Sequence, residues 1–285
     1  MSRRTKIAVI AGFVLLAVLV MTSLFPPLRM ASGFDRLSTS EMRRAERMFE
    51  EAVASPSEAS WQQPARSSGF QIDRHSDFTA LTETEGDCRG RGIYLLRNQG
   101  ASSPVAVTAP HRGSDRHTGT LAEMLFREGG LAAAGWNSAP RRKSAECSAH
   151  GDLAKARRHF FTAFTTGFAQ VYPQGRVVQL HGFDRQRRSS GAGRAADFIV
   201  SDGTDRPGDR LLALSECLTF ALPEWNVRVY PLDAAELGGL SNVQGEALRE
   251  IGFAGFVHVE ISLAARRALL EKEDMRRHFV QCLMA

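Results

Sequence analysis

Short apolar runs alternate with longer amphipathic stretches along most of the chain. Runs of strand length occupy residues 92–97, 104–109, 176–183, 196–203, 227–232 and 255–262. The first two runs are joined by "NQGASS", which predicts neighbouring strands, with a hairpin as one arrangement. Strands separated by helices predict an α/β fold with a mixed, mostly parallel central sheet and helices on both of its faces.

Helical periodicity fills the intervals between these runs. The predicted helices cover residues 38–54, 120–135, 152–172, 209–222, 243–252 and 264–283. Ser38 and Glu41 match a capping box at the start of the first helix. Residues 55–69 are rich in serine and proline and predict an irregular surface segment or linker. We therefore divide the chain into an N-terminal segment (1–33), a helix with an irregular linker (34–87) and an α/β hydrolytic domain (88–285).

The N-terminal segment carries a targeting signal. Arg3, Arg4 and Lys6 precede nineteen uncharged residues, Ile7 to Phe25, which is long enough for a helix that crosses a bilayer. The positive flank predicts that the following domain lies outside the cytoplasm, in the periplasm or the extracellular space. A cleaved signal peptide is the alternative, with a small-residue site at residues 31–33. Both alternatives predict export of residues 34–285.

Composition and cysteine usage agree with an exported globular protein. The net charge is only +5, and the arginines are scattered without interleaved aromatic residues, so we expect no nucleic-acid partner. The four cysteines form no C-x-x-C pair, which argues against a cysteine zinc site and allows disulfides in an oxidising compartment. Spacing alone leaves the connectivity open, and we expect the pairs Cys88–Cys147 and Cys217–Cys282.

Polar residues of catalytic type stand at the ends of three apolar runs. "VAVTAPH" ends at His111, "VVQLH" ends at His181, and "FVHVE" reaches Glu260. Ligands in open α/β sheets bind beyond the carboxyl ends of the strands. Hydrolytic zinc sites use three protein ligands of histidine or carboxylate type and leave one position open. The pattern predicts a zinc site with Glu260 as the base that takes a proton from water.

The loop "PHRGSDRHTG" leaves the third zinc ligand open. Asp115 is our preferred ligand, and His117 is the alternative, because both follow His111 closely. A free Asp115 would instead cap the helix that begins near Thr118. The arginines beside the site, Arg112 in the loop and Arg185 after His181, are candidates for binding a substrate carboxylate.

These motifs resemble those of two hydrolase families. "PHRGSDRHTGT" is similar to the metal-binding loop of poly-gamma-glutamate hydrolases and to the start of N-formylglutamate amidohydrolases, "VVQLHGF" resembles the strand with the second metal histidine, and "GFVHVEIS" resembles the strand with the catalytic glutamate. The resemblance implies a zinc-carboxypeptidase-like fold with an eight-stranded mixed sheet. This chain departs from the carboxypeptidase His-x-x-Glu spacing, because Ser114 occupies the third position and the acid is Asp115.

The function predicted from the sequence is an exported zinc-dependent hydrolase of amide bonds. Its substrate would be a peptide, a gamma-glutamyl compound or an N-acyl amino acid that carries a carboxylate. Two alternatives remain: a non-catalytic exported binding module on the same fold, and a metal-dependent deacetylase that acts on amino sugars.

Overall fold

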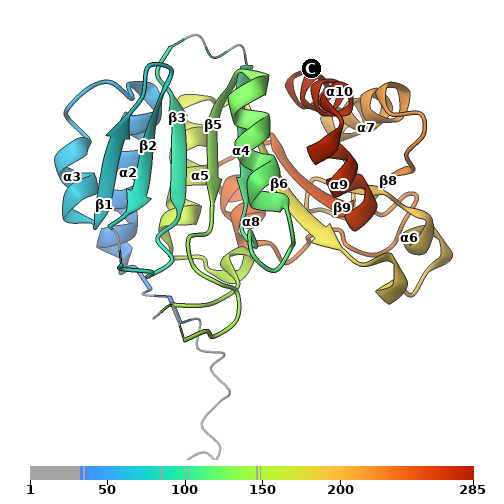
Figure 1. Cartoon of the computed structure of the whole chain (residues 1–285), viewed down its shortest axis with the longest axis horizontal. Helices are drawn as coiled ribbons and strands as arrows, with labels where there is room; N and C mark the ends of the chain where they lie inside the picture. Colours follow the sequence, from blue (N-terminus) through green and yellow to red (C-terminus); the bar gives the residue numbers. More distant parts are fainter. Residues whose placement is uncertain are drawn as a thin grey trace, which may run out of the picture. The chain divides into compact units, whose positions relative to one another are not determined.

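In the described part of the chain, nine β-strands form one sheet in the order β1-β2-β3-β5-β4-β6-β9-β7-β8 (Figure 1). The computed structural model describes residues 33–285 except 35, 85, 100, 102, 146 and 148. The strands are β1 (Phe70–Arg74), β2 (Phe78–Glu83), β3 (Ile93–Arg97), β4 (Ser103–Ala109), β5 (Leu131–Trp136), β6 (Arg176–Phe183), β7 (Phe198–Ser201), β8 (Val227–Val229) and β9 (Phe256–Ser262).

The centre of the sheet is parallel. Strand β4 pairs in parallel with β5 and with β6, and β6 pairs in parallel with β9. Strands β1, β2 and β3 join antiparallel on one side, and β7 joins β9 antiparallel on the other. The predicted mixed α/β sheet with a largely parallel core is confirmed. The prediction that β3 and β4 are neighbouring strands is wrong, and they form no hairpin, because β5 lies between them.

Helices cover both faces of the sheet (Figure 1). On one face, α4 (Thr118–Gly129), α7 (Asp209–Ala221), α9 (Leu263–Glu271) and α10 (Glu273–Met284) enclose one apolar core. On the other face, α2 (Thr39–Ala54), α5 (Phe160–Val171) and α8 (Val243–Glu250) enclose a second core. The shorter helices are α3 (Gln62–Ser67), α6 (Gly191–Ala195) and the 3₁₀ turns η1 (Leu153–Lys155) and η2 (Arg185–Arg187).

Strand alternation decides which face receives the polar residues of β6 and β9. Val178 and Leu180 of β6 belong to the core beneath α4 and α9, whereas Val177 belongs to the core beneath α5. Because successive side chains point to opposite faces, Gln179 and His181 lie on the Val177 face. The same alternation places His258 and Glu260 of β9 on that face, since Phe256 belongs to the same core as Val177.

Four local predictions need correction. Residues 62–67 form α3, and Trp61 before it is fully buried, so this segment is not irregular throughout. Residues 131–136 form β5, not the end of a helix, because Gly130 leaves the helix with a φ of 65°. The helix expected over 152–172 is η1 followed by α5, and the last helix is broken at Lys272 into α9 and α10. Strands β1 and β2 were not foreseen.

Both expected disulfides are present. Cys88 bonds Cys147 and Cys217 bonds Cys282. Two disulfides are typical of proteins outside the cytoplasm. The predicted N-terminal apolar helix lies outside the described residues, and none of the helices within 33–285 is long and apolar enough to span a membrane.

Candidate metal centre

The parallel centre of the sheet brings three candidate residues to one edge. Strands β4, β6 and β9 are neighbours, and His111 follows the carboxyl end of β4. His181 and Glu260 lie opposite each other in the register of β6 and β9, on the same face of the sheet. The convergence expected from the strand ends is therefore present in the structure.

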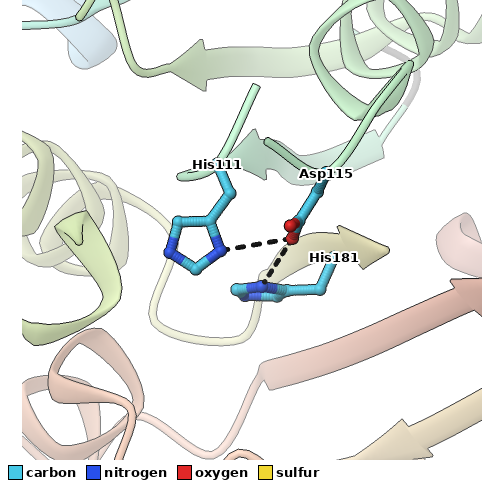
Figure 2. Close-up of side chains that lie close together, drawn as sticks. All are labelled: His111, Asp115 and His181. Atoms are coloured by element: carbon cyan, nitrogen blue, oxygen red, sulfur yellow. Dashed lines mark hydrogen bonds and ion pairs between the residues drawn. The ribbon is translucent and has the colours of Figure 1, made fainter. Parts of the chain in front are cut away.

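His111, Asp115 and His181 form a compact buried group (Figure 2). Each offers one ligand atom, and these atoms lie within 4.8 Å of one another. Oδ2 of Asp115 lies 3.2 Å from Nδ1 of His111 and 3.4 Å from Nδ1 of His181. Figure 2 shows both imidazole rings directed at the one carboxylate. Such a donor set can hold a metal ion.

A tight turn aims Asp115 at the two histidines. The Asp115 N–H donates to the His111 carbonyl oxygen at 2.8 Å, and the N–H of Thr118 donates to the Asp115 carbonyl oxygen at 3.0 Å. Oδ2 of Asp115 also accepts the backbone N–H of Gly182 at 3.1 Å, which ties the loop to β6. Helix α4 then begins at Thr118.

His117, the alternative ligand, lies outside this group. It is the N-cap residue of α4 in the left-handed conformation, with a φ of 78°, and its side chain makes no capping hydrogen bond. Burial, followed by the charges of Arg266 and Arg116, lowers the pKa of this imidazole. Of the two loop residues, the structure brings Asp115 to the histidines.

The far nitrogen of His111 faces a carboxylate that the sequence did not reveal. Nε2 of His111 lies 2.6 Å from Oδ1 of Asp152, and Arg141 donates to Oδ2 of the same carboxylate at 2.6 Å. Burial opposes the charged imidazole, but the hydrogen bonds of Asp115 and Asp152 outweigh it and raise the pKa of His111. Burial also acts on Asp152, yet the hydrogen bond of His111 and the charge of Arg141 lower its pKa to about 2.

A buried amide network fixes which nitrogen of His181 carries the proton. Oδ1 of Asn242 accepts the backbone N–H groups of Gln244 and Gly245, so Nδ2 of Asn242 must be the donor. Nδ2 donates to Oε1 of Gln179. That oxygen lies 2.8 Å from Nε2 of His181 and therefore accepts its proton.

His181 is consequently neutral, with its lone pair on Nδ1. Burial, followed by the charge of His258, lowers its pKa to about 4. Asp115 is ionised, because the hydrogen bond and the charge of His111 outweigh its burial and lower its pKa well below the usual value. Two acceptor atoms, Nδ1 of His181 and Oδ2 of Asp115, thus face each other inside the protein. A cation between them would relieve this arrangement.

Glu260 lies beside this group and has an unused carboxylate oxygen. Oε1 lies 3.4 Å from Nε2 of His258, whereas Oε2 is buried without a hydrogen-bond partner in the described structure. Burial raises the pKa of Glu260, but the hydrogen bond of His258 outweighs this and lowers it. Glu260 is therefore an anion that can accept a proton at Oε2.

Arg266 of α9 joins the segments that carry these residues. Its guanidinium donates to the carbonyl oxygens of Arg116 at 2.6 Å, Phe183 at 3.4 Å and Ser262 at 3.4 Å. The side chain is buried and packs where a Cβ at Gly182 would stand. Glycine at position 182 therefore leaves the room that this contact between β6 and α9 needs.

The group opens into a large cleft with a volume of about 1410 Å³. Its lining includes His111, Asp115, His181, Glu260 and Arg185, but not Arg112. Arg185 donates to the carbonyl oxygens of Ala195 and Ala196 and pairs with Asp197 at 3.0 Å. The side chain of Arg112 instead covers Gly119 of α4.

The sequence missed Asp152 and Gln179 as members of this environment. Asp152 meets His111 across 41 residues of chain, so no local pattern links the two. The alternation in "VVQLH" was a usable signal for Gln179, because residues two positions apart share a strand face. The same alternation in "FVHVE" predicts His258 on the face of Glu260, where it can support that carboxylate, and Nε2 of His258 lies 3.4 Å from Oε1 of Glu260.

The comparisons with known proteins find similarity only to solved structures. No protein-family model matches the chain, and no curated protein matches it. It is similar to a solved bacteriophage poly-gamma-glutamate hydrolase, with 15% identity, a TM-score of 0.43, and coverage of 71% of this chain and 89% of that one.

Two further solved structures have the same TM-score. N-formylglutamate amidohydrolase from Ralstonia eutropha JMP134 is 14% identical, over 68% of this chain and 95% of that one, with a TM-score of 0.43. Succinylglutamate desuccinylase from Vibrio parahaemolyticus is 13% identical, over 83% and 80%, also with a TM-score of 0.43. The two families that the motifs resemble are thus among the structural neighbours, at low identity.

Proposed function

We propose that the chain is an exported zinc-dependent hydrolase of an amide bond. The observation that carries this proposal is the pair of acceptor atoms, Nδ1 of His181 and Oδ2 of Asp115, held 3.4 Å apart in a buried site that opens into the cleft. All of the proposed site residues fall within the predicted hydrolytic domain, residues 88–285.

The donor set fits zinc, with His111, Asp115 and His181 as its ligands. Zinc bonds of roughly 2.0–2.1 Å in tetrahedral geometry separate two ligand atoms by about 3.3 Å. Oδ2 of Asp115 lies 3.2 and 3.4 Å from the two histidine nitrogens. Asp152 and Gln179 hold the opposite ring nitrogens, as the acceptors behind metal-binding histidines commonly do.

Glu260 would serve as the general base. Zinc, when bound, supplies Lewis acidity that polarises a carbonyl group and lowers the pKa of water. Oε2 of Glu260 would take a proton from the attacking water and deliver it to the leaving amine. Nε2 of His258 lies 3.4 Å from Oε1 of the same carboxylate, which leaves Oε2 free to accept the proton.

The cleft favours a substrate with a carboxylate. Its lining includes Arg116, Arg142 and Arg267, and no carboxylate lies within salt-bridge distance of these arginines in the described structure. Nη1 of Arg185 is also without a hydrogen bond there, so Arg185 remains a proposed carboxylate contact. Peptides, gamma-glutamyl compounds and N-acyl amino acids all satisfy this requirement. The side chain of Arg112 would have to move away from Gly119 to contact the substrate carboxylate.

Export and membrane attachment complete the proposal. The two disulfides support a location outside the cytoplasm. The uncharged stretch from Ile7 to Phe25 after a basic flank supports an N-terminal membrane anchor. The domain would then work in the periplasm or outside the cell.

Hydrolysis of a substrate panel tests the proposal. We expect the zinc-loaded chain to cleave at least one compound among acyl-amino acids, gamma-glutamyl peptides and cell-wall peptides. Glu260→Gln should lower that rate by about 10²- to 10⁴-fold, because general base catalysis contributes this much. Equal rates in the two proteins, or a chain that binds no zinc when zinc is supplied, would contradict it.

A further inference from the structure

A second cavity lies at the opposite edge of the sheet from the candidate metal centre. It has a volume of about 550 Å³ and is lined by Arg176 and Val257, near the amino ends of β6 and β9. Cavities that bind small molecules range from about 300 to 1,000 Å³. His181 and Glu260 stand toward the other ends of the same two strands, so the two sites are separate.

Four arginines line this cavity: Arg176, Arg206, Arg210 and Arg249. Among the described residues, no aspartate or glutamate carboxylate comes within 4.0 Å of these four guanidinium groups; Arg176 is buried, whereas Arg206, Arg210 and Arg249 are exposed. The lining therefore presents several guanidinium groups that are not paired with acidic side chains. Their fork geometry suits phosphate and carboxylate oxygens.

Two of the arginines are held by main-chain oxygens. Arg176 is only 6% exposed and donates to the carbonyl oxygen of Leu283 at 2.7 Å and to an oxygen of the last residue, Ala285, at 3.2 Å. Arg210 donates to the carbonyl oxygen of Gln174 at 3.0 Å. Burial, followed by the charge of Arg210, lowers the pKa of Arg176. Arg210 also donates to the carbonyl oxygen of Gly175, the residue before Arg176, so both cations border the same cavity, and an anion there would offset their charge.

The acidic residues of the cavity wall do not neutralise this charge. The carboxylate of Asp202 accepts hydrogen bonds within its own loop, from the N–H groups of Thr204 at 3.0 Å and Gly208 at 2.9 Å. Asp209 is the second acid in the lining. The lining therefore contains more basic than acidic side chains, four arginines against two aspartates.

Apolar side chains complete the wall. Leu211, Phe253, Phe256 and Val257 line the cavity between the arginines. An anion without an apolar part would leave this surface in contact with water. A ligand with a charged head and an apolar body would use both kinds of lining.

We propose that this cavity binds a small phosphate ester, with the phosphate held by the arginines and the apolar part of the ester against Leu211 and Phe253. The inference is independent of the proposed hydrolytic function, because no residue is shared between the two sites. It adds a ligand site at the amino-terminal edge of β6 and β9.

Calorimetric titration of the full chain with inorganic phosphate, phenyl phosphate and phenol tests this site. We expect phenyl phosphate to bind about tenfold more tightly than phosphate, because a buried ring adds apolar contact, and phenol alone to show no binding. Arg206→Gln should weaken phenyl phosphate binding about tenfold or more. This variant suits the test because the Arg206 guanidinium makes no hydrogen bond or ion pair within the described residues, so its loss leaves no internal partner behind.

Two matched variants separate this cavity from other basic surfaces. Arg43→Gln changes an exposed arginine of α2, and Arg116→Gln changes an arginine of the metal-centre cleft. Neither should alter phenyl phosphate affinity. The proposal is overturned if no phosphate compound binds, if Arg206→Gln binds as tightly as the unmodified chain, or if Arg116→Gln abolishes the binding, which would place the ligand in the other cleft.

Discussion

Nδ1 of His181 and Oδ2 of Asp115 lie 3.4 Å apart in a buried site, and each presents a lone pair to the other. The carboxylate is ionised. The proton of the imidazole sits on Nε2, because Oε1 of Gln179 accepts it there. Two facing acceptors in a buried site cost free energy unless a cation lies between them. This relationship is the physical basis of the proposed zinc site.

Gln179→Met should therefore weaken zinc binding. The variant removes the acceptor that holds the proton of His181 on Nε2, so that Nδ1 is no longer kept free for the metal. Loss of such a supporting group lowers metal affinity about 10- to 100-fold. Competition with a zinc chelator at pH 8 measures the change. Gln179→Glu keeps an acceptor at the same place and is the control; equal affinities in the Met variant and the unmodified chain would show that the network does not set the tautomer.

Asp152→Asn should weaken zinc binding through His111. The substitution keeps the size of the side chain and an oxygen for the Ala154 N–H, but removes the negative charge 2.6 Å from Nε2 of His111. We expect an affinity about 10- to 100-fold lower at pH 8, where competition from protons is weak. Asp184→Asn, at an exposed acid that lines the same cleft, should leave the affinity unchanged. A loss of the same size in both variants would indicate a general effect of charge.

His159 should lower the free energy of unfolding of the metal-free protein as the pH falls. This buried imidazole is the N-cap of α5 and accepts the Phe161 N–H at 3.0 Å. Burial lowers its pKa to about 3, against roughly 6.5 in an unfolded chain. The unfolded state therefore binds one more proton between these two values, and stability falls by about 1.4 kcal/mol for each pH unit below 6.5.

His159→Asn tests this pH dependence, because asparagine can cap the helix without titrating. Urea unfolding of the chelator-treated protein between pH 7 and pH 4 should show a slope smaller by about 1.4 kcal/mol per pH unit in the variant. His278→Asn changes an exposed histidine of α10 and should keep the slope of the unmodified chain. An unchanged slope in His159→Asn would mean that another group takes up the proton.

The sequence predicted those parts of the fold in which local pattern and final environment agree. Strands β4, β6 and β9 consist mainly of buried apolar residues, as expected for strands covered on both faces, and polar residues stand near or just after their carboxyl ends. The alanine-rich segment of β5 was predicted as a helix, because alanine is a strong helix former. The burial of this segment between β3 and β4 depends on partners that are distant in the sequence. The pair Gly129–Gly130 carried the missed signal, since glycine commonly ends a helix in the left-handed conformation.

The candidate site was predictable only where strand ends deliver it. His111, His181 and Glu260 follow from adjacent parallel strands whose carboxyl ends meet at one edge. Asp152 comes from a connection that the helical pattern of residues 152–172 concealed, and its distance along the chain from His111 hides the pairing. The choice between Asp115 and His117 required the geometry of the turn, which a sequence pattern does not specify.

Zinc stoichiometry across four variants at neutral pH tests the account most directly. We expect about one zinc ion per chain in the unmodified protein, in Glu260→Gln, whose side chain is a base and not a ligand, and in His117→Ala, whose imidazole lies outside the group. His111→Ala and His181→Ala should each retain essentially none. Full zinc occupancy in His181→Ala would contradict the proposed site, whatever activity that variant showed.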